Sequence, residues 1–103
     1  MTIHIQYQHM PASESLSKII TRNLHKLAHK YQFLIRAEVS LKLGNGIKGN
    51  DKVCEMEISA PGPRLFAKSS GDDFEKAAAE TLSELERQLR KRKAKFRRSN
   101  RTI

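Results

Sequence analysis

The spacing of apolar residues switches along the chain between that of strands and that of helices, and this switching is the strongest constraint on the fold. Residues 2–9 alternate apolar and polar side chains, as a half-buried strand does. From residue 14 to 31 the apolar residues recur every three or four positions, which predicts an amphipathic helix. Ser13 is its predicted N-cap, and Glu14 suits the helix dipole. The apolar stripe of this helix comprises Leu16, Ile19, Ile20, Leu24, Leu27 and Tyr31.

Alternation returns in three later segments, 34–43, 52–60 and 64–70. The glycine-rich stretch GNGIKGND reads as a loop between the first two, and APGP predicts a turn before the third. Strands joined so briefly are expected to pair antiparallel. The residues predicted to face the core are Ile3, Ile5, Tyr7, Ala37, Val39, Leu41, Leu43, Cys54, Met56, Ile58, Leu65 and Ala67, with Arg64, Phe66 and Lys68 on the opposite face of the sheet.

The last predicted element is a long helix that begins after Asp72, its predicted N-cap, and ends at Phe96. Glu75 stands three residues after the cap, in a variant of the capping box. Arg92 interrupts the apolar stripe. Because an unpaired arginine is costly to bury, we expect the helix to pass the edge of the sheet after Leu89. The stripe comprises Phe74, Ala78, Leu82, Leu85, Leu89 and Phe96.

These elements in the order β-α-β-β-β-α predict an α+β fold in which two helices pack on one face of a four-stranded sheet, as in double-stranded-RNA-binding domains. A chain of 103 residues suits one domain, expected over residues 1–96, with a short, mobile basic tail at 97–103. The single cysteine, Cys54, cannot form an internal disulfide, which suits a reducing compartment. Neither a secretory leader nor an apolar stretch of membrane-spanning length is visible, so we expect a cytoplasmic protein.

The net charge of +9 comes entirely from the C-terminal end of the chain. Residues 1–86 contain eleven bases and all eleven acids, whereas residues 87–103 contain nine bases and no acid. A concentrated positive field attracts polyanions and speeds their encounter. The charge pattern therefore predicts a polyanionic partner, either nucleic acid or an anionic membrane.

A second basic feature lies on the first helix, where Lys18, Arg22, Lys26 and Lys30 follow one another at intervals of four. Like charges at this spacing repel one another, so such a ridge is better satisfied by a polyanion than by water. Structured RNA is favoured over duplex DNA, because the predicted fold offers no recognition helix and RNA is often recognised by shape.

Three other readings of these features stay open. A membrane surface is disfavoured, because the basic end offers only Phe96 and Ile103 for insertion. A basic protein-interaction module that acts on an acidic partner, such as a transcription factor, is the alternative from another class. Phe66, between Arg64 and Lys68, could stack on a base, although no RNA-recognition motif surrounds it.

Catalysis has little support in the sequence. His25 and His29 have a spacing that can bind a metal, but no further ligand completes the pattern. Cys54 is expected to be a buried, unreactive thiol. GNGIKG lacks the spacing of a phosphate-binding loop and leads into a strand. We expect no enzyme, no metal site and no cofactor.

Several stretches resemble one known family. They are SESL at the start of the first helix, HKLAHKY at its end, AEVSLKL, LFAKSSGDDFEKAA and above all LERQLRKRKAK. Over residues 1–96 the chain resembles the ribosome hibernation promoting factors, once called sigma-54 modulation proteins. The resemblance implies a β-α-β-β-β-α protein that binds the small ribosomal subunit between head and body. There it would cover the positions of messenger and transfer RNA and silence translation in stationary phase or under stress.

The resemblance also implies particular RNA-binding residues and a mode of action. It implies a short-form member that is a monomer off the ribosome and needs a separate factor to pair ribosomes. The RNA-binding residues that it implies are Lys26, Lys30, Arg87, Lys91, Lys93 and Lys95, to which the basic helical ridges add Lys18, Arg22, Arg90, Arg97 and Arg98.

Overall fold

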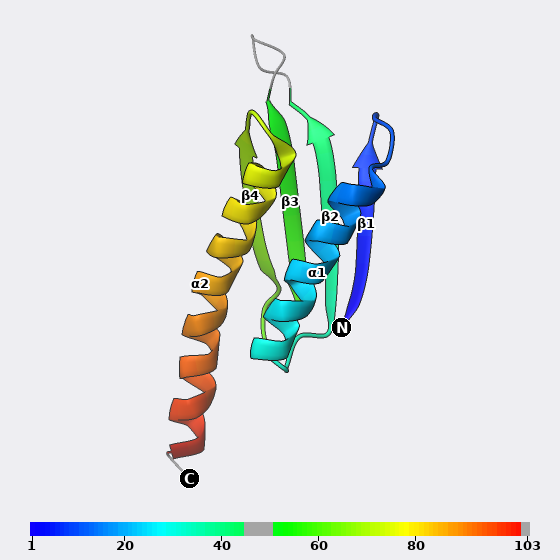
Figure 1. Cartoon of the computed structure of the whole chain (residues 1–103). Coiled ribbons are helices and arrows are strands. Elements are labelled where there is room, and N and C mark those ends of the chain that lie inside the picture. The colour runs from blue at the N-terminus through cyan, green and yellow to red at the C-terminus, as the bar shows by residue number, and fades with distance from the viewer. Residues whose placement is uncertain (45–50, 102–103) are drawn as a thin grey trace.

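A computed structural model describes residues 1–44 and 51–101, with side chains described as far as Arg97 (Figure 1). The predicted loop at 45–50, the side chain of Arg98 and the end of the predicted tail lie outside this description. The order β-α-β-β-β-α is confirmed. The elements are β1 (Thr2–Gln8), α1 (Glu14–Lys30), β2 (Arg36–Leu43), β3 (Lys52–Ser59), β4 (Leu65–Gly71) and α2 (Phe74–Arg101).

The four strands form one sheet in the order β1-β2-β3-β4. β1 and β2 are parallel because α1 carries the chain back between them, whereas β2, β3 and β4 pair antiparallel as predicted. The register places Ile5 beside Val39, Val39 beside Met56, and Met56 beside Ala67. This apolar row crosses the whole sheet, and Figure 1 shows both helices on one face of it.

The core forms between this sheet face and the apolar stripes of the two helices. From α1 it takes Leu16, Ile20, Leu24 and Leu27, and Ile3, Ile5 and Tyr7 pack against its edge, as predicted. One inward prediction is wrong, because Leu43 is 52% exposed. It is the last residue of β2, where the tip of the strand extends beyond α1 (Figure 1). α2 also buries a polar residue that sequence analysis did not assign: Thr81, whose hydroxyl donates to the Ala77 carbonyl at 2.7 Å.

The helix ends are partly as predicted. Ser13 caps α1, since its Oγ accepts from the Leu16 amide at 3.3 Å. The cap of α2 is Asp73 and not Asp72, because Asp73 Oδ1 accepts from the Glu75 amide at 2.6 Å. This one-residue shift moves Glu75 out of the capping-box position. The predicted end at Phe96 is also wrong: α2 continues to Arg101, and the added residues include no glycine or proline to stop it.

Arg92, the interruption in the apolar stripe of α2, is half-buried and hydrogen-bonded to the protein rather than directed into solvent. Its Nη1 donates to the Pro61 carbonyl at 2.8 Å, and its Nη2 donates to the Pro63 carbonyl at 2.7 Å. Between these prolines Gly62 has a φ of 97°, and a Cβ there would lie 3.1 Å from Arg92 Nη1. Arg92 therefore clamps α2 to the turn between β3 and β4. As predicted, α2 runs past the edge of the sheet (Figure 1), but the expectation that Arg92 is carried into solvent there is wrong.

Replacing the clamp should destabilise the fold without touching the core. We expect Arg92→Met, which keeps an apolar stem, to lower the free energy of unfolding by about 1–3 kcal/mol because two charged hydrogen bonds are lost. Urea denaturation measures this. The matched control Arg90→Met changes an exposed arginine of the same helix and should cost under about 0.5 kcal/mol. Equal effects of the two changes would show that the carbonyl contacts contribute nothing.

Candidate nucleic-acid interface

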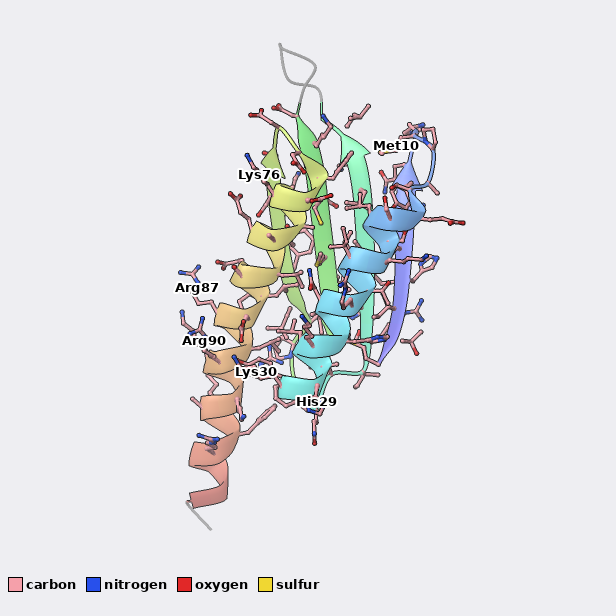
Figure 2. All side chains as sticks on the ribbon, in the orientation of Figure 1. Met10, His29, Lys30, Lys76, Arg87 and Arg90 are labelled. Atoms are coloured by element: carbon pink, nitrogen blue, oxygen red, sulfur yellow. The ribbon has the colours of Figure 1, made fainter. Side chains whose placement is uncertain are left out.

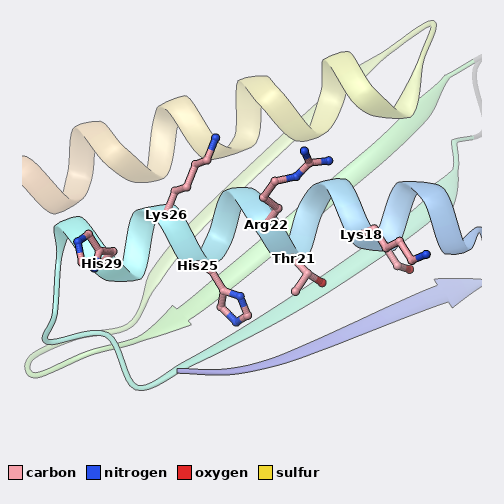
Figure 3. Close-up of a pocket in the computed structure, with 7 residues that line it drawn as sticks. Lys18, Thr21, Arg22, His25, Lys26 and His29 are labelled. Carbon is pink, nitrogen blue, oxygen red and sulfur yellow. The ribbon is translucent and has the colours of Figure 1, made fainter.

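The outer surface of α1 carries the predicted basic ridge. Lys18, Arg22 and Lys26 are exposed, and within the described residues none has a carboxylate at ion-pair distance. Arg22 and Lys26 project on the side of α1 nearer α2, and Thr21 and His25 on the side nearer β1 (Figure 3). These three cations share an open surface of α1 with Thr21, His25 and His29. They are thus available to an anionic partner.

The predicted bases of α2 divide between two sides of that helix. Lys93 and Arg97 line a cleft against the end of α1. Arg90, three residues before Lys93, lines a separate hollow on α2 together with Glu84 and Arg87. Lys91 and Lys95 are exposed on the flank above β4, the flank from which the Gln88 side-chain amide donates to the Phe66 carbonyl at 2.9 Å. The structure therefore joins only part of the α2 cluster to the α1 ridge. Arg98 lies outside the described side chains.

Two of the predicted RNA-binding residues are engaged with acids of the protein itself. Lys30 on α1 pairs with Glu86 on α2, and this hydrogen bond raises the pKa of Lys30. Both carboxylate oxygens of Glu84 accept from Arg87 Nη2, at 2.7 and 2.8 Å, and the pKa of Arg87 is raised by this contact. A phosphate that binds these cations would compete with their carboxylate partners. Figure 2 shows Lys30 between the two helices and Arg87 on the side of α2 that faces away from α1.

Glu86 is the residue of this surface that sequence analysis missed. Its Oε2 accepts from Lys30 and lies 3.4 Å from the Tyr31 hydroxyl, so one carboxylate ties the end of α1 to the middle of α2. The hydrogen bond from Lys30 is the main cause of the lowered pKa of Glu86. The sequence of α2 places Glu86 next to the bases of that helix. The contact between Glu86 and Lys30 forms only because α1 packs on the sheet beside α2.

The open face of the sheet has a different electrostatic character. Its three carboxylates, Glu38, Glu55 and Glu57, each pair with bases or with His4. Although burial opposes it, the pKa of Glu55 is lowered, because Lys42 and Lys68 together outweigh the desolvation. Phe66 is 52% exposed on this face, in a hollow that all three carboxylates line. The two bases that flank Phe66, Arg64 and Lys68, are paired with Glu57 and Glu55 and are therefore engaged within the protein, which argues against the reading of Phe66 as a base-stacking platform.

The groups considered for catalysis are arranged as follows. Cys54 is buried, and burial raises the pKa of its thiol to about 11, so it holds its proton at neutral pH. His25 and His29 are exposed on α1. Over the described ranges, no three His, Cys, Asp or Glu side chains gather as a metal site requires. Over the same ranges, no helix is long and apolar enough to cross a membrane.

The paired carboxylates predict how stability changes in acid. The pKa values of Glu38, Glu55, Glu84 and Glu86 lie below their ordinary value of 4.5. Below about pH 4.5 the unfolded chain therefore binds more protons than the native state, and stability falls with falling pH. We expect a thermal midpoint that is nearly level from about pH 7 to 5 and then drops.

Calorimetry across this range measures the midpoint. The double variant Glu84→Gln with Glu86→Gln should show a shallower acid decline than the wild type, because two of the four titrating groups are gone. A midpoint that rises on acidification would contradict the assignment.

Comparison with known proteins agrees with this architecture. The protein resembles the structure of a ribosomal subunit interface protein from Coxiella burnetii, with a TM-score of 0.82, 22% identity and coverage of 91% of this chain and 99% of that chain. It also resembles the N-terminal domain of Protein Y from Thermus thermophilus, with a TM-score of 0.76, 19% identity and coverage of 88% and 98%. At these identities the likeness shows the shared fold.

A search of the curated proteins finds no match to this chain. The sequence pattern of one family, however, matches residues 3–97, almost the whole described domain. With this match, the chain belongs to the family described as sigma 54 modulation protein / S30EA ribosomal protein.

Proposed function

We propose that this protein binds the small ribosomal subunit through ribosomal RNA, in the channel used by messenger and transfer RNA, and so inhibits translation. The observation that carries the proposal is the segregation of charge between the two sides of the domain. Among the described residues, cations without a carboxylate partner occupy the helix side, along α1 and the adjoining side of α2, whereas the acids of the sheet side are paired. The negatively charged phosphate groups of RNA are complementary to the cations of the helix side.

Family membership supports the same partner. The family description names a ribosomal protein, and the similar Coxiella protein is described as a ribosomal subunit interface protein. We extend that association to this chain as a binding protein of the cytoplasm rather than an enzyme, used in stationary phase or under stress. A domain held in the channel would block messenger and transfer RNA by occupying their space and competing for the same phosphates.

The two ion pairs of the helix side would let RNA bind by taking the place of a carboxylate. Lys30 and Arg87 are held by Glu86 and Glu84 in the free protein. Exposed ion pairs contribute little to stability, so exchanging a carboxylate for a phosphate costs little. The paired cations are thus held in place on the helix side until RNA replaces their acidic partners.

The alternative partner is an acidic protein, such as a transcription factor. Both partners would bind the same cations, but only a complex with RNA would be sensitive to ribonuclease. Treatment of a cell lysate with ribonuclease should release the protein from large complexes if RNA is the partner, and should leave an acidic-protein complex intact.

Charge reversal tests the interface directly. We expect Arg22→Glu with Lys26→Glu on α1, and Arg87→Glu with Lys91→Glu on α2, each to weaken binding to purified small subunits by at least about tenfold, because each removes two cations and adds two repulsive charges. Co-sedimentation of protein with subunits measures binding.

The matched control makes the same change of charge on the sheet side, Arg64→Glu with Lys68→Glu. Both residues are exposed there. This control should bind with nearly wild-type affinity, although it should lower the free energy of unfolding by up to about 1 kcal/mol per substitution, because it sets new carboxylates against Glu57 and Glu55. Urea denaturation of all three double variants checks that each is folded under the conditions of the binding measurement. A control as defective as the helix variants would mean that net charge alone, and not this surface, controls binding.

We further propose that the protein is a monomer off the ribosome and that pairing of ribosomes needs a separate factor. A closed dimer uses the same patch on both copies, and the basic helix side repels its own copy. Purified ribosomes mixed with this protein alone should therefore show inhibited translation and no dimer peak in a sucrose gradient. A substantial dimer peak would overturn this part of the proposal.

A further inference from the structure

A cleft lies between the end of α1, the segment that follows it and the C-terminal half of α2. It has a volume of about 370 Å³, within the range of roughly 300–1,000 Å³ that small-molecule sites occupy. Its lining within the described residues contains no acid. Figure 2 shows Lys30 at the end of α1 on the side that approaches α2, and His29 projecting away from the same end of that helix. The residues that matter in its lining are Lys30, Tyr31, Phe33, Lys93, Phe96 and Arg97.

Three aromatic rings meet in this cleft. Phe33 and Phe96 stand edge to face, with centroids 5.1 Å apart and planes at 83°. Tyr31 lies 6.1 Å from Phe33 at 71° and is buried, so it belongs to the core beneath the cleft. Phe33 and Phe96 are only half-buried, and they leave ring surface open to the solvent. Such surface can be covered by a flat aromatic group.

Cations surround these rings. Lys93 Nζ lies 5.6 Å from the centroid of the Tyr31 ring, which holds the ammonium group over the cleft. Among the residues described, neither Lys93 nor Arg97 has a carboxylate at ion-pair distance. Lys30, at the other edge, is paired with Glu86. Aromatic surface beside unpaired cations suits a ligand that is flat at one end and anionic at the other.

We propose that this cleft binds one unpaired RNA nucleotide, its base against Phe33 and Phe96 and its phosphate at Lys93 and Arg97. The inference rests on the proposed RNA-binding function and adds to it that the protein contacts a base as well as backbone phosphates. Bases within a duplex are stacked on their neighbours and do not reach a side cleft, so the cleft selects a single-stranded or flipped nucleotide. Phe66 is a less suitable site for a base, because carboxylates line the hollow in which it lies.

The test compares two RNAs and three variants. The RNAs are a single-stranded oligonucleotide and a hairpin duplex with the same number of phosphates, and fluorescence anisotropy measures their affinities. We expect Phe33→Leu and Phe96→Leu each to weaken single-strand binding about fivefold or more, the loss of one modest stacking contact. Leucine keeps apolar packing, and duplex binding should change little. The matched control is Phe66→Leu, which alters the exposed aromatic of the opposite face and should leave both affinities unchanged.

The possible outcomes separate this inference from the proposed function. If the wild type binds both RNAs and the Phe33 and Phe96 variants bind the single strand equally well, the cleft is not a nucleotide site, although RNA binding stands. If only Phe66→Leu weakens single-strand binding, the base lies on the sheet and the inference is overturned. If the wild type binds neither RNA, the proposed function itself fails and this inference fails with it.

A measurement on the wild-type protein tests the proposal without relying on the folding of any variant. On titration with the single-stranded oligonucleotide, the ring-proton resonances of Phe33 and Phe96 should shift in nuclear magnetic resonance spectra, because a stacked base changes their shielding. The Phe66 resonances should stay in place. Static Phe33 and Phe96 signals at saturating RNA would overturn the proposal whatever the variants show.

Discussion

Burial of two helices against one face of a single sheet is the constraint on which the rest of this structure depends. The row from Ile5 through Val39 and Met56 to Ala67 makes that face apolar from edge to edge. Each helix must lay its apolar stripe on this face to remove it from water. The outward surfaces of both helices consequently lie on the same side of the domain, and so do many of the cations that they carry. An RNA-binding side thus follows from the way in which the core is built.

Electrostatics then divides the domain into two unlike sides. On the sheet side, cross-strand neighbours such as Glu55 and Lys68 neutralise one another. On the helix side, Glu86 is the acid that joins the two helices, where it holds Lys30. A carboxylate at this position reduces repulsion between the basic helices in the free protein. It also holds Lys30 beside the cleft, where Lys93 and Arg97 have no carboxylate partner within the described part of the chain. The same contact therefore serves folding and, in our proposal, prepares the binding surface.

Arg92 shows how a charged residue inside an apolar stripe becomes structural. Its guanidinium meets the carbonyls of Pro61 and Pro63, which are held in a tight turn by Gly62. This clamp fixes α2 at the edge of the sheet, beyond which the helix continues toward the C-terminus (Figure 1). It also keeps Phe96, one turn further along, in contact with Phe33. A side chain that sequence analysis expects in solvent thus helps to position the cleft.

By itself the sequence determined the order and kind of the elements and the presence of a basic face, because periodicity and the i, i+4 spacing of bases are local properties of the chain. It did not determine which bases are free. Lys30 and Glu86 are 56 positions apart, and the parallel pairing of β1 with β2 places α1 next to α2 so that they meet. The Arg92 clamp and the contact of Phe33 with Phe96 were likewise decided only by tertiary structure, since each joins α2 to a distant turn or loop through a three-dimensional distance that periodicity does not encode.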